Sequence, residues 1–119
     1  MTSKELACKA VKVLDNKKAV NIKMVGIKDI SVLTDYFVIA TGTSSTHVKS
    51  LADEVEFKLK EEGIKPEHTE GYRSNSWVLL DYGGIIVHIF TEDARSFYDL
   101  DHLWQDGEAI DISSLVTSE

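Results

Sequence analysis

Residues 77–90 read Trp77-Val78-Leu79-Leu80-Asp81-Tyr82-Gly83-Gly84-Ile85-Ile86-Val87-His88-Ile89-Phe90, and they carry the clearest fold signal in the chain. Two largely apolar runs flank Gly83-Gly84, a dipeptide typical of a two-residue turn between antiparallel strands. The stretch therefore predicts a β-hairpin, and a two-residue turn fixes its register. The predicted cross-strand pairs are Tyr82–Ile85, Asp81–Ile86, Leu80–Val87, Leu79–His88, Val78–Ile89 and Trp77–Phe90.

Alternation along the strands divides the hairpin side chains between two faces. The first face is almost wholly apolar and is predicted to be core. The second combines two large aromatic rings with a carboxylate and an imidazole, and two interpretations stay open. In the first interpretation it is a second packed layer, in which neighbouring residues provide the polar partners of Asp81 and His88. In the second it is a partly open recognition surface, because protein interfaces are rich in aromatic residues. The first face holds Val78, Leu80, Tyr82, Ile85, Val87 and Ile89, and the second holds Trp77, Leu79, Asp81, Ile86, His88 and Phe90.

The residues outside the hairpin predict alternating helices and strands. Apolar spacing indicates helices, alternation or continuous apolar runs indicate strands, and Gly63 is suited to end the central helix in a left-handed conformation. The order is αββαββα, which predicts an α/β (α+β) fold with a mixed sheet and flanking helices. The expected elements are a helix over 3–18, strands over 19–27 and 36–41, a helix to about 62, a polar loop over 67–76, the hairpin, a helix over 92–104 and a short edge strand near Ile110 and Ile112.

The last predicted helix contains more apolar residues than one core stripe can hold. Leu100, Leu103 and Trp104 suit that stripe, with Phe97 beside them, which displaces Tyr98 toward an edge. The single base after residue 86 also lies in this helix. Arg95 is either a structural ion-pair hub or an anchor for an acidic or aromatic group of a partner.

The composition indicates one folded domain. The chain has 119 residues, of which 43% are hydrophobic, with seven glycines and one proline. Cys8 is the only cysteine, which excludes an internal disulfide framework and favours a reducing compartment. We see no signal peptide and no apolar run near the roughly 20 residues of a membrane helix, so we expect a cytoplasmic protein without a membrane span.

The charge is distributed unevenly around a net value of −7. Residues 1–28 hold seven lysines and two acids, a net +5, while the remaining residues hold six bases and eighteen acids, a net −12. The acidic body disfavours general binding of phosphate backbones. The asymmetry indicates a macromolecular partner, although a basic helix lying on an acidic body would produce the same pattern.

The motifs of common enzymes are not evident. The four histidines are scattered, so no metal site is predicted, and no cofactor fingerprint is found. The Thr41–Ser45 turn between a strand and a helix resembles a phosphate-facing turn and the turn that opens the nucleotidyltransferase fold. That chemistry needs paired carboxylates on a following strand, whereas Asp53 and Glu56 lie on the solvated side of a helix and Asp81 has no acidic partner nearby. We therefore expect kinship with that fold without transferase activity.

Several blocks of this sequence together resemble the Iojap family, the bacterial ribosomal silencing factors. The resemblance covers roughly residues 3–106, which predicts a single domain over 1–106 and a tail over 107–119. Gly84 and Asp101 depart slightly from the family pattern. The matching blocks are residues 29–44, Glu70-Gly71, residues 77–83 and 87–90, Arg95, Phe97-Tyr98, Leu100 and Leu103-Trp104.

The resemblance implies a protein that is not an enzyme and needs no cofactor. Such proteins bind the large ribosomal subunit through its protein number fourteen, block joining of the small subunit and repress translation when nutrients are short. The implied fold is a mixed sheet related to nucleotidyltransferases without their catalytic carboxylates. From the pattern together with the resemblance, we predict a partner-binding site made of Trp77, Leu79, Asp81, His88, Phe90, Arg95 and Tyr98.

Two other functions remain open at the level of sequence. One is a nucleotidyltransferase-type enzyme or nucleotide sensor that uses the Thr41–Ser45 turn as a phosphate cradle. The other is a homodimer that buries the same aromatic face against a second copy of the chain.

Overall fold

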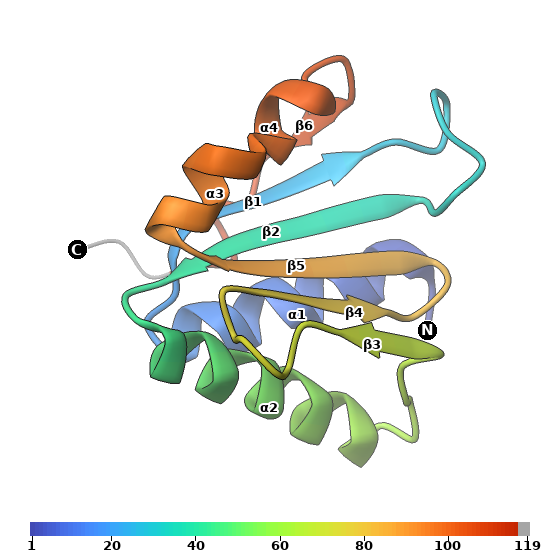
Figure 1. The fold of residues 1–119 in the computed structure, drawn as a ribbon. Helices are drawn as coiled ribbons and strands as arrows, with labels where there is room; N and C mark the ends of the chain where they lie inside the picture. Colours follow the sequence, from blue (N-terminus) through green and yellow to red (C-terminus); the bar gives the residue numbers. More distant parts are fainter. Residues whose placement is uncertain (117–119) are drawn as a thin grey trace.

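Six strands form one mixed sheet in the computed structural model, which describes residues 1–116 (Figure 1). The strands are β1 (Val20–Gly26), β2 (Tyr36–Gly42), β3 (His68–Glu70), β4 (Trp77–Asp81), β5 (Ile85–Thr91) and β6 (Glu108–Ile110). Their order across the sheet is β3-β4-β5-β2-β1-β6. The central pair, β2 and β5, is parallel, and the other neighbouring pairs are antiparallel. The predicted mixed sheet is confirmed.

Within residues 1–116, four helices cover the two faces of this sheet. They are α1 (Ser3–Asn16), α2 (Ser45–Glu61), α3 (Glu92–Tyr98) and α4 (Leu100–Leu103). The two long helices, α1 and α2, lie side by side against one face, while α3 and α4 lie over the other (Figure 1). Thr2 caps α1 through a capping box with Glu5, and Ser44 caps α2. At the end of α2, Gly63 has a φ of +79° and the Ile64 N–H donates to the Leu59 carbonyl, the geometry of a Schellman motif.

The hairpin has the register that its two-residue turn predicts. Trp77 lies opposite Phe90, Leu79 opposite His88, and so on along the ladder to Asp81 and Ile86. The first face is core, as expected: all six of its side chains are buried against α1 and α2. Because strand side chains alternate, the same register places His88 on the second face, beneath α3 and α4.

The predicted helix over 92–104 is wrong in one respect, because it breaks at Asp99. This residue has a φ of +49°, in the left-handed region, so the chain turns there and α4 begins in a new direction. Thr91 caps the start of α3. The break also changes burial: Leu100 is in the core and Trp104 is half-buried, but Leu103 and Phe97 are exposed. Apolar spacing alone does not predict this turn. The turn accompanies contacts of Arg95 with residues that lie far away in the sequence.

Three other features differ from the expected elements or extend them. The polar segment predicted as a loop over 67–76 contains β3, an exposed edge strand paired with β4, where polar side chains suit solvent contact. In β1, apolar side chains do not alternate regularly between the two faces, and Val20 is exposed. Asn21 has a φ of +50°, and the pairing register of β1 with β2 shifts between Val20 and Lys23. The edge strand expected near Ile110 is confirmed as β6, which pairs with β1. The domain boundary at residue 106 stays a prediction.

Candidate functional site

The second face of the sheet carries an aromatic cluster that is only partly covered. Ile86, His88 and Phe90 of β5 are buried in it, together with Phe37 of β2. Toward solvent the cluster becomes half-exposed. The residues in this outer part are Trp77, Leu79 and Trp104.

Trp77 links the buried part of this cluster to the solvent. Its indole stacks on the Phe90 ring at a centroid distance of 4.9 Å, and the Tyr98 ring lies 4.7 Å from it on α3. Phe97 meets Tyr98 edge-on at 5.0 Å. Tyr98 is 52% exposed and Phe97 is 80% exposed. Four aromatic rings therefore form a continuous series from the core to the surface.

His88 fixes the orientation of the Trp77 indole. The indole Nε1–H donates to His88 Nδ1 at 3.1 Å, so the imidazole proton of the neutral ring is on Nε2. Within the described chain, that Nε2 has no hydrogen-bond partner, and the Phe37 ring packs against the imidazole at 4.8 Å in a T-shaped contact. Burial lowers the pKa of His88 from its usual 6.5 to about 4. The imidazole is neutral at pH 7 and accepts the indole hydrogen bond.

The His88 pKa predicts a loss of stability in mild acid. Because the folded protein resists protonation that the unfolded chain accepts, the free energy of unfolding falls as the pH drops from 6.5 toward 4. The expected contribution of His88 over that range is about 3 kcal/mol. Urea unfolding at several pH values measures it, with His88→Gln as the comparison. Parallel pH profiles for the two proteins would contradict this assignment.

Arg95 holds α3 and α4 together across the break at Asp99. Its guanidinium makes two hydrogen bonds to the Asp101 carboxylate, both 3.0 Å long. It also donates to Thr41 Oγ1 at 2.9 Å and to the carbonyl of Asn21 at 2.5 Å. The Arg95 side chain is only 11% exposed. This is the geometry of an ion-pair hub, one of the two interpretations that the sequence left open.

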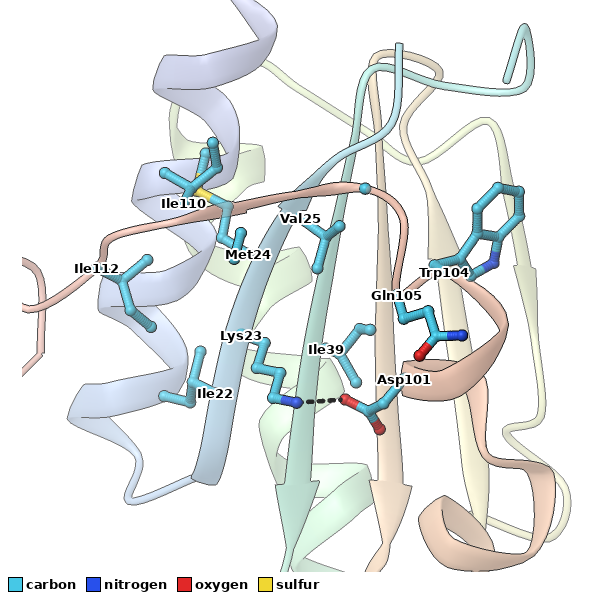
Figure 2. A pocket seen from close by; sticks show the side chains of 12 residues that line it. Ile22, Lys23, Met24, Val25, Ile39, Asp101, Trp104, Gln105, Ile110 and Ile112 are labelled. Atoms are coloured by element: carbon cyan, nitrogen blue, oxygen red, sulfur yellow. Dashed lines mark ion pairs between the residues drawn. The ribbon is translucent and has the colours of Figure 1, made fainter. Parts of the chain in front are cut away.

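Asp101 receives a second cation from β1. Lys23 Nζ lies 3.1 Å from the Asp101 carboxylate, and Figure 2 shows the two side chains pointing toward each other. The hydrogen bonds from Arg95, with a smaller contribution from Lys23, lower the pKa of Asp101 to about 2. The carboxylate is therefore ionised at neutral pH and anchors α4 to the edge of the sheet.

The segment that follows β5 and carries α3 and α4 is strongly acidic. Between residues 92 and 108 there are six acids and one base, Arg95, which is paired with Asp101. Five of these acids are exposed. Asp81, at the hairpin end, is half-buried, and its Oδ1 accepts a hydrogen bond from the Gly83 N–H. The five exposed acids are Glu92, Asp93, Asp99, Asp106 and Glu108.

The structure brings most of the predicted site residues together but gives them different surroundings. Trp77, Leu79 and Tyr98 reach the surface, whereas His88 and Phe90 lie beneath them as support. Asp81 lies farther along β4, and Arg95 faces β1 and β2. Sequence reasoning placed Leu103 in the core stripe and Phe97 beside it, although both are exposed. The crowding of apolar residues in 92–104 was the available signal.

The Thr41–Ser45 turn is a poor candidate for a phosphate-binding site. The N–H of Thr43 donates to His47 Nδ1 at 2.9 Å, and the N–H of His47 donates to Ser44 Oγ at 3.1 Å. A Cβ on Gly42 would lie 2.8–2.9 Å from Val48, so helix α2 already fills the space next to the turn. These donors are used within the fold. Among residues 1–116 there is also no group of three side chains placed to hold a metal ion.

One cavity of about 360 Å³ opens beside β1, beneath β6 and α4 (Figure 2). Its wall is mostly aliphatic, with Trp104 at one end, and its polar groups include the Lys23–Asp101 pair and Gln105. This lining contains no phosphate-binding loop. The cavity lies at the β1–β6 side of the sheet, whereas Trp77 lies on β4 toward the other side.

Together these features define a small α/β protein in which one sheet face is covered by two long helices and the other carries an aromatic cluster beneath a short, acidic helical segment. A family model described as "Ribosomal silencing factor during starvation" matches residues 1–119. The chain belongs to this ribosomal silencing factor family, as its resemblance to the Iojap family predicts. In the described part of the chain, no helix is long and apolar enough to cross a membrane.

Individual relatives agree with this assignment. A ribosomal silencing factor of Halalkalibacterium halodurans is 35% identical over 117 residues, covering 98% of this chain and 100% of that protein. One from Bacillus subtilis is 36% identical over 112 residues, covering 94% of this chain and 95% of the relative. The crystal structure of a Chromobacterium violaceum protein superposes with a TM-score of 0.86 at 34% identity, over 88% of each chain.

Proposed function

We propose that this protein binds the large ribosomal subunit in the cytoplasm, through its protein number fourteen, and thereby prevents the small subunit from joining. The observation that carries the proposal is the position of Trp77, which stacks on buried Phe90 and contacts the exposed Tyr98 of the acidic helix α3. Large aromatic side chains held in place by a packed layer are typical of the residues that dominate binding energy. Membership in the ribosomal silencing factor family supports the ribosome as the binding partner.

The charge of the surface favours a protein partner over ribosomal RNA. Five exposed acids on residues 92–108 repel phosphates and attract basic side chains. This repulsion directs the aromatic cluster away from ribosomal RNA and toward a basic protein surface. In this proposal, the acids increase the rate of correct encounters and the rings provide most of the affinity.

The size of the molecule is sufficient for steric exclusion. The fold measures 33 × 33 × 32 Å. A rigid body of that size, seated where the two subunits meet, separates surfaces that must come into direct contact. The proposed action is therefore a blocked interface without a chemical reaction, and repression of translation when nutrients are short follows from fewer joined ribosomes.

Sedimentation of ribosomal subunits tests the proposal. Purified large subunits are incubated with a stoichiometric excess of this protein before small subunits are added, and the joined particles are separated on a sucrose gradient. We expect the peak of joined ribosomes to shrink and the protein to migrate with the large subunit. Unchanged joining at that excess would disprove the proposed mechanism.

Pairing of two copies through the same face would compete with ribosome binding. Light scattering over a range of protein concentrations measures this pairing. A mass that rises with concentration, and a Trp77→Ala variant that stays monomeric, would support a homodimer on this face. A constant monomer mass would exclude it.

A further inference from the structure

The connection between β1 and β2 exposes three aliphatic side chains. Val32 is fully exposed, Leu33 is 62% exposed, and Ile30 is 48% exposed. Single exposed apolar residues are common on protein surfaces, but three within four positions form a patch. This connection lies at the opposite end of the sheet from α3, as Figure 1 shows.

Hydrogen bonds hold this exposed segment in a defined shape. The Ile27 N–H donates to the Asp35 carbonyl at 2.9 Å and closes the base of the loop. The Leu33 N–H donates to Ser31 Oγ at 3.0 Å near its tip. Ile27 is fully buried, which anchors the start of the loop in the core. A loop fixed in this way loses little conformational entropy when a partner covers it.

The segment is also tied to the turn of the β4–β5 hairpin. Thr34 Oγ1 donates to the Gly83 carbonyl at 2.8 Å, and the Asp35 N–H donates to the Gly84 carbonyl at 3.1 Å. The aromatic cluster is built on the same hairpin, so the two surfaces are parts of one rigid unit. The loop adjoins the end of the surface that also carries Asp81.

We propose that Ile30, Val32 and Leu33 form a second apolar contact of the ribosome-binding surface and insert into an apolar depression of the same basic ribosomal protein. This inference rests on the proposed function. The patch is flanked by the exposed Asp29 and the half-buried Asp35, with Lys28 as the single base of residues 28–35, so the segment carries a net charge of −1 that matches basic side chains around such a depression.

Other classes of partner fit this patch less well. Aliphatic side chains do not provide the stacking surface with which aromatic residues hold unpaired bases, and the flanking acids repel phosphates. The same acids oppose contact with an anionic membrane. A protein surface is the occupant that the charges and the side-chain types favour together.

The test is a Val32→Ser/Leu33→Ser double variant, measured for binding to purified large subunits by quantitative co-sedimentation. The matched control is Phe57→Ser, because Phe57 is 55% exposed on α2, on the opposite side of the sheet. We expect the dissociation constant of the double variant to rise about tenfold or more and that of the control to stay within twofold of the wild type. All three side chains are exposed, so the melting temperatures should be unchanged.

The outcomes separate this inference from the proposed function. If the double variant binds like the wild type while Trp77→Ala is weakened, the loop contact is disproved and the proposed function stands. If neither variant is weakened although the wild type binds, both the loop contact and the aromatic contact are disproved; if the wild type does not bind the large subunit, the proposed function fails. Wild-type binding to a short duplex RNA or to phosphatidylserine vesicles that the double variant loses would also overturn the inference, since the patch would then serve another class of partner.

Discussion

Replacing Trp77 by alanine is expected to weaken binding to the large ribosomal subunit by about 2 kcal/mol or more, a loss of about thirtyfold in affinity. The indole supplies the apolar contact between Phe90 and Tyr98, and without it Tyr98 has no ring to pack against on that side. The variant also leaves His88 Nδ1 without its indole donor. Co-sedimentation with purified large subunits, over a range of concentrations, measures the change.

Two controls separate binding from folding in this experiment. Trp77→Phe keeps a ring over Phe90 but removes the hydrogen bond to His88, so we expect a smaller loss than in Trp77→Ala. Phe57→Ala removes an exposed ring from α2 and should leave binding unchanged. Circular dichroism at the assay temperature establishes that each variant is folded. A folded Trp77→Ala protein that binds within twofold of the wild type would assign Trp77 to the core alone.

Replacing Gly71 by alanine is expected to destabilise the fold by about 3 kcal/mol or more. Gly71 follows β3 with a φ of +91°, a conformation that residues with a Cβ seldom adopt. A Cβ at this position would also lie 1.8 Å from the carbonyl oxygen of Trp77, so the backbone at the start of β4 must shift. Urea unfolding measures the change in free energy, and the displaced Trp77 should change its fluorescence as well.

Gly63 provides the matched comparison for this prediction. It also has a positive φ, +79°, but a Cβ there would meet no atom within 4 Å. We therefore expect Gly63→Ala to cost only about 1 kcal/mol, the conformational penalty alone. Equal decreases in the free energy of unfolding for the two variants would mean that the close approach of Gly71 to Trp77 does not restrict the residue at position 71.

The elements that could be predicted from the sequence depend on local signals. Gly83-Gly84 and the alternation around it were sufficient for the hairpin register, and Gly63 was sufficient for the end of α2. The break at Asp99 could not be predicted in this way. It accompanies the contacts of Arg95 with Asn21 and Thr41, which are distant in the sequence.

In the candidate site, too, the features set by local sequence signals could be predicted, and those set by tertiary contacts could not. Alternation in β5 predicted that His88 and Phe90 share a face with Trp77, and the structure confirms that arrangement. Their burial depends on α3 packing over the sheet, a tertiary contact that the sequence pattern does not specify. For the same reason, Phe97 was expected beside the core but is exposed on the far side of Tyr98.

Hydrogen–deuterium exchange of this protein, free and bound to the large subunit, tests most directly whether the aromatic and acidic face is the binding surface. We predict slower exchange in β4, in α3 and α4, and in residues 29–35, with no change along the outer side of α1 and α2. Protection confined to α1 and α2 would contradict the account.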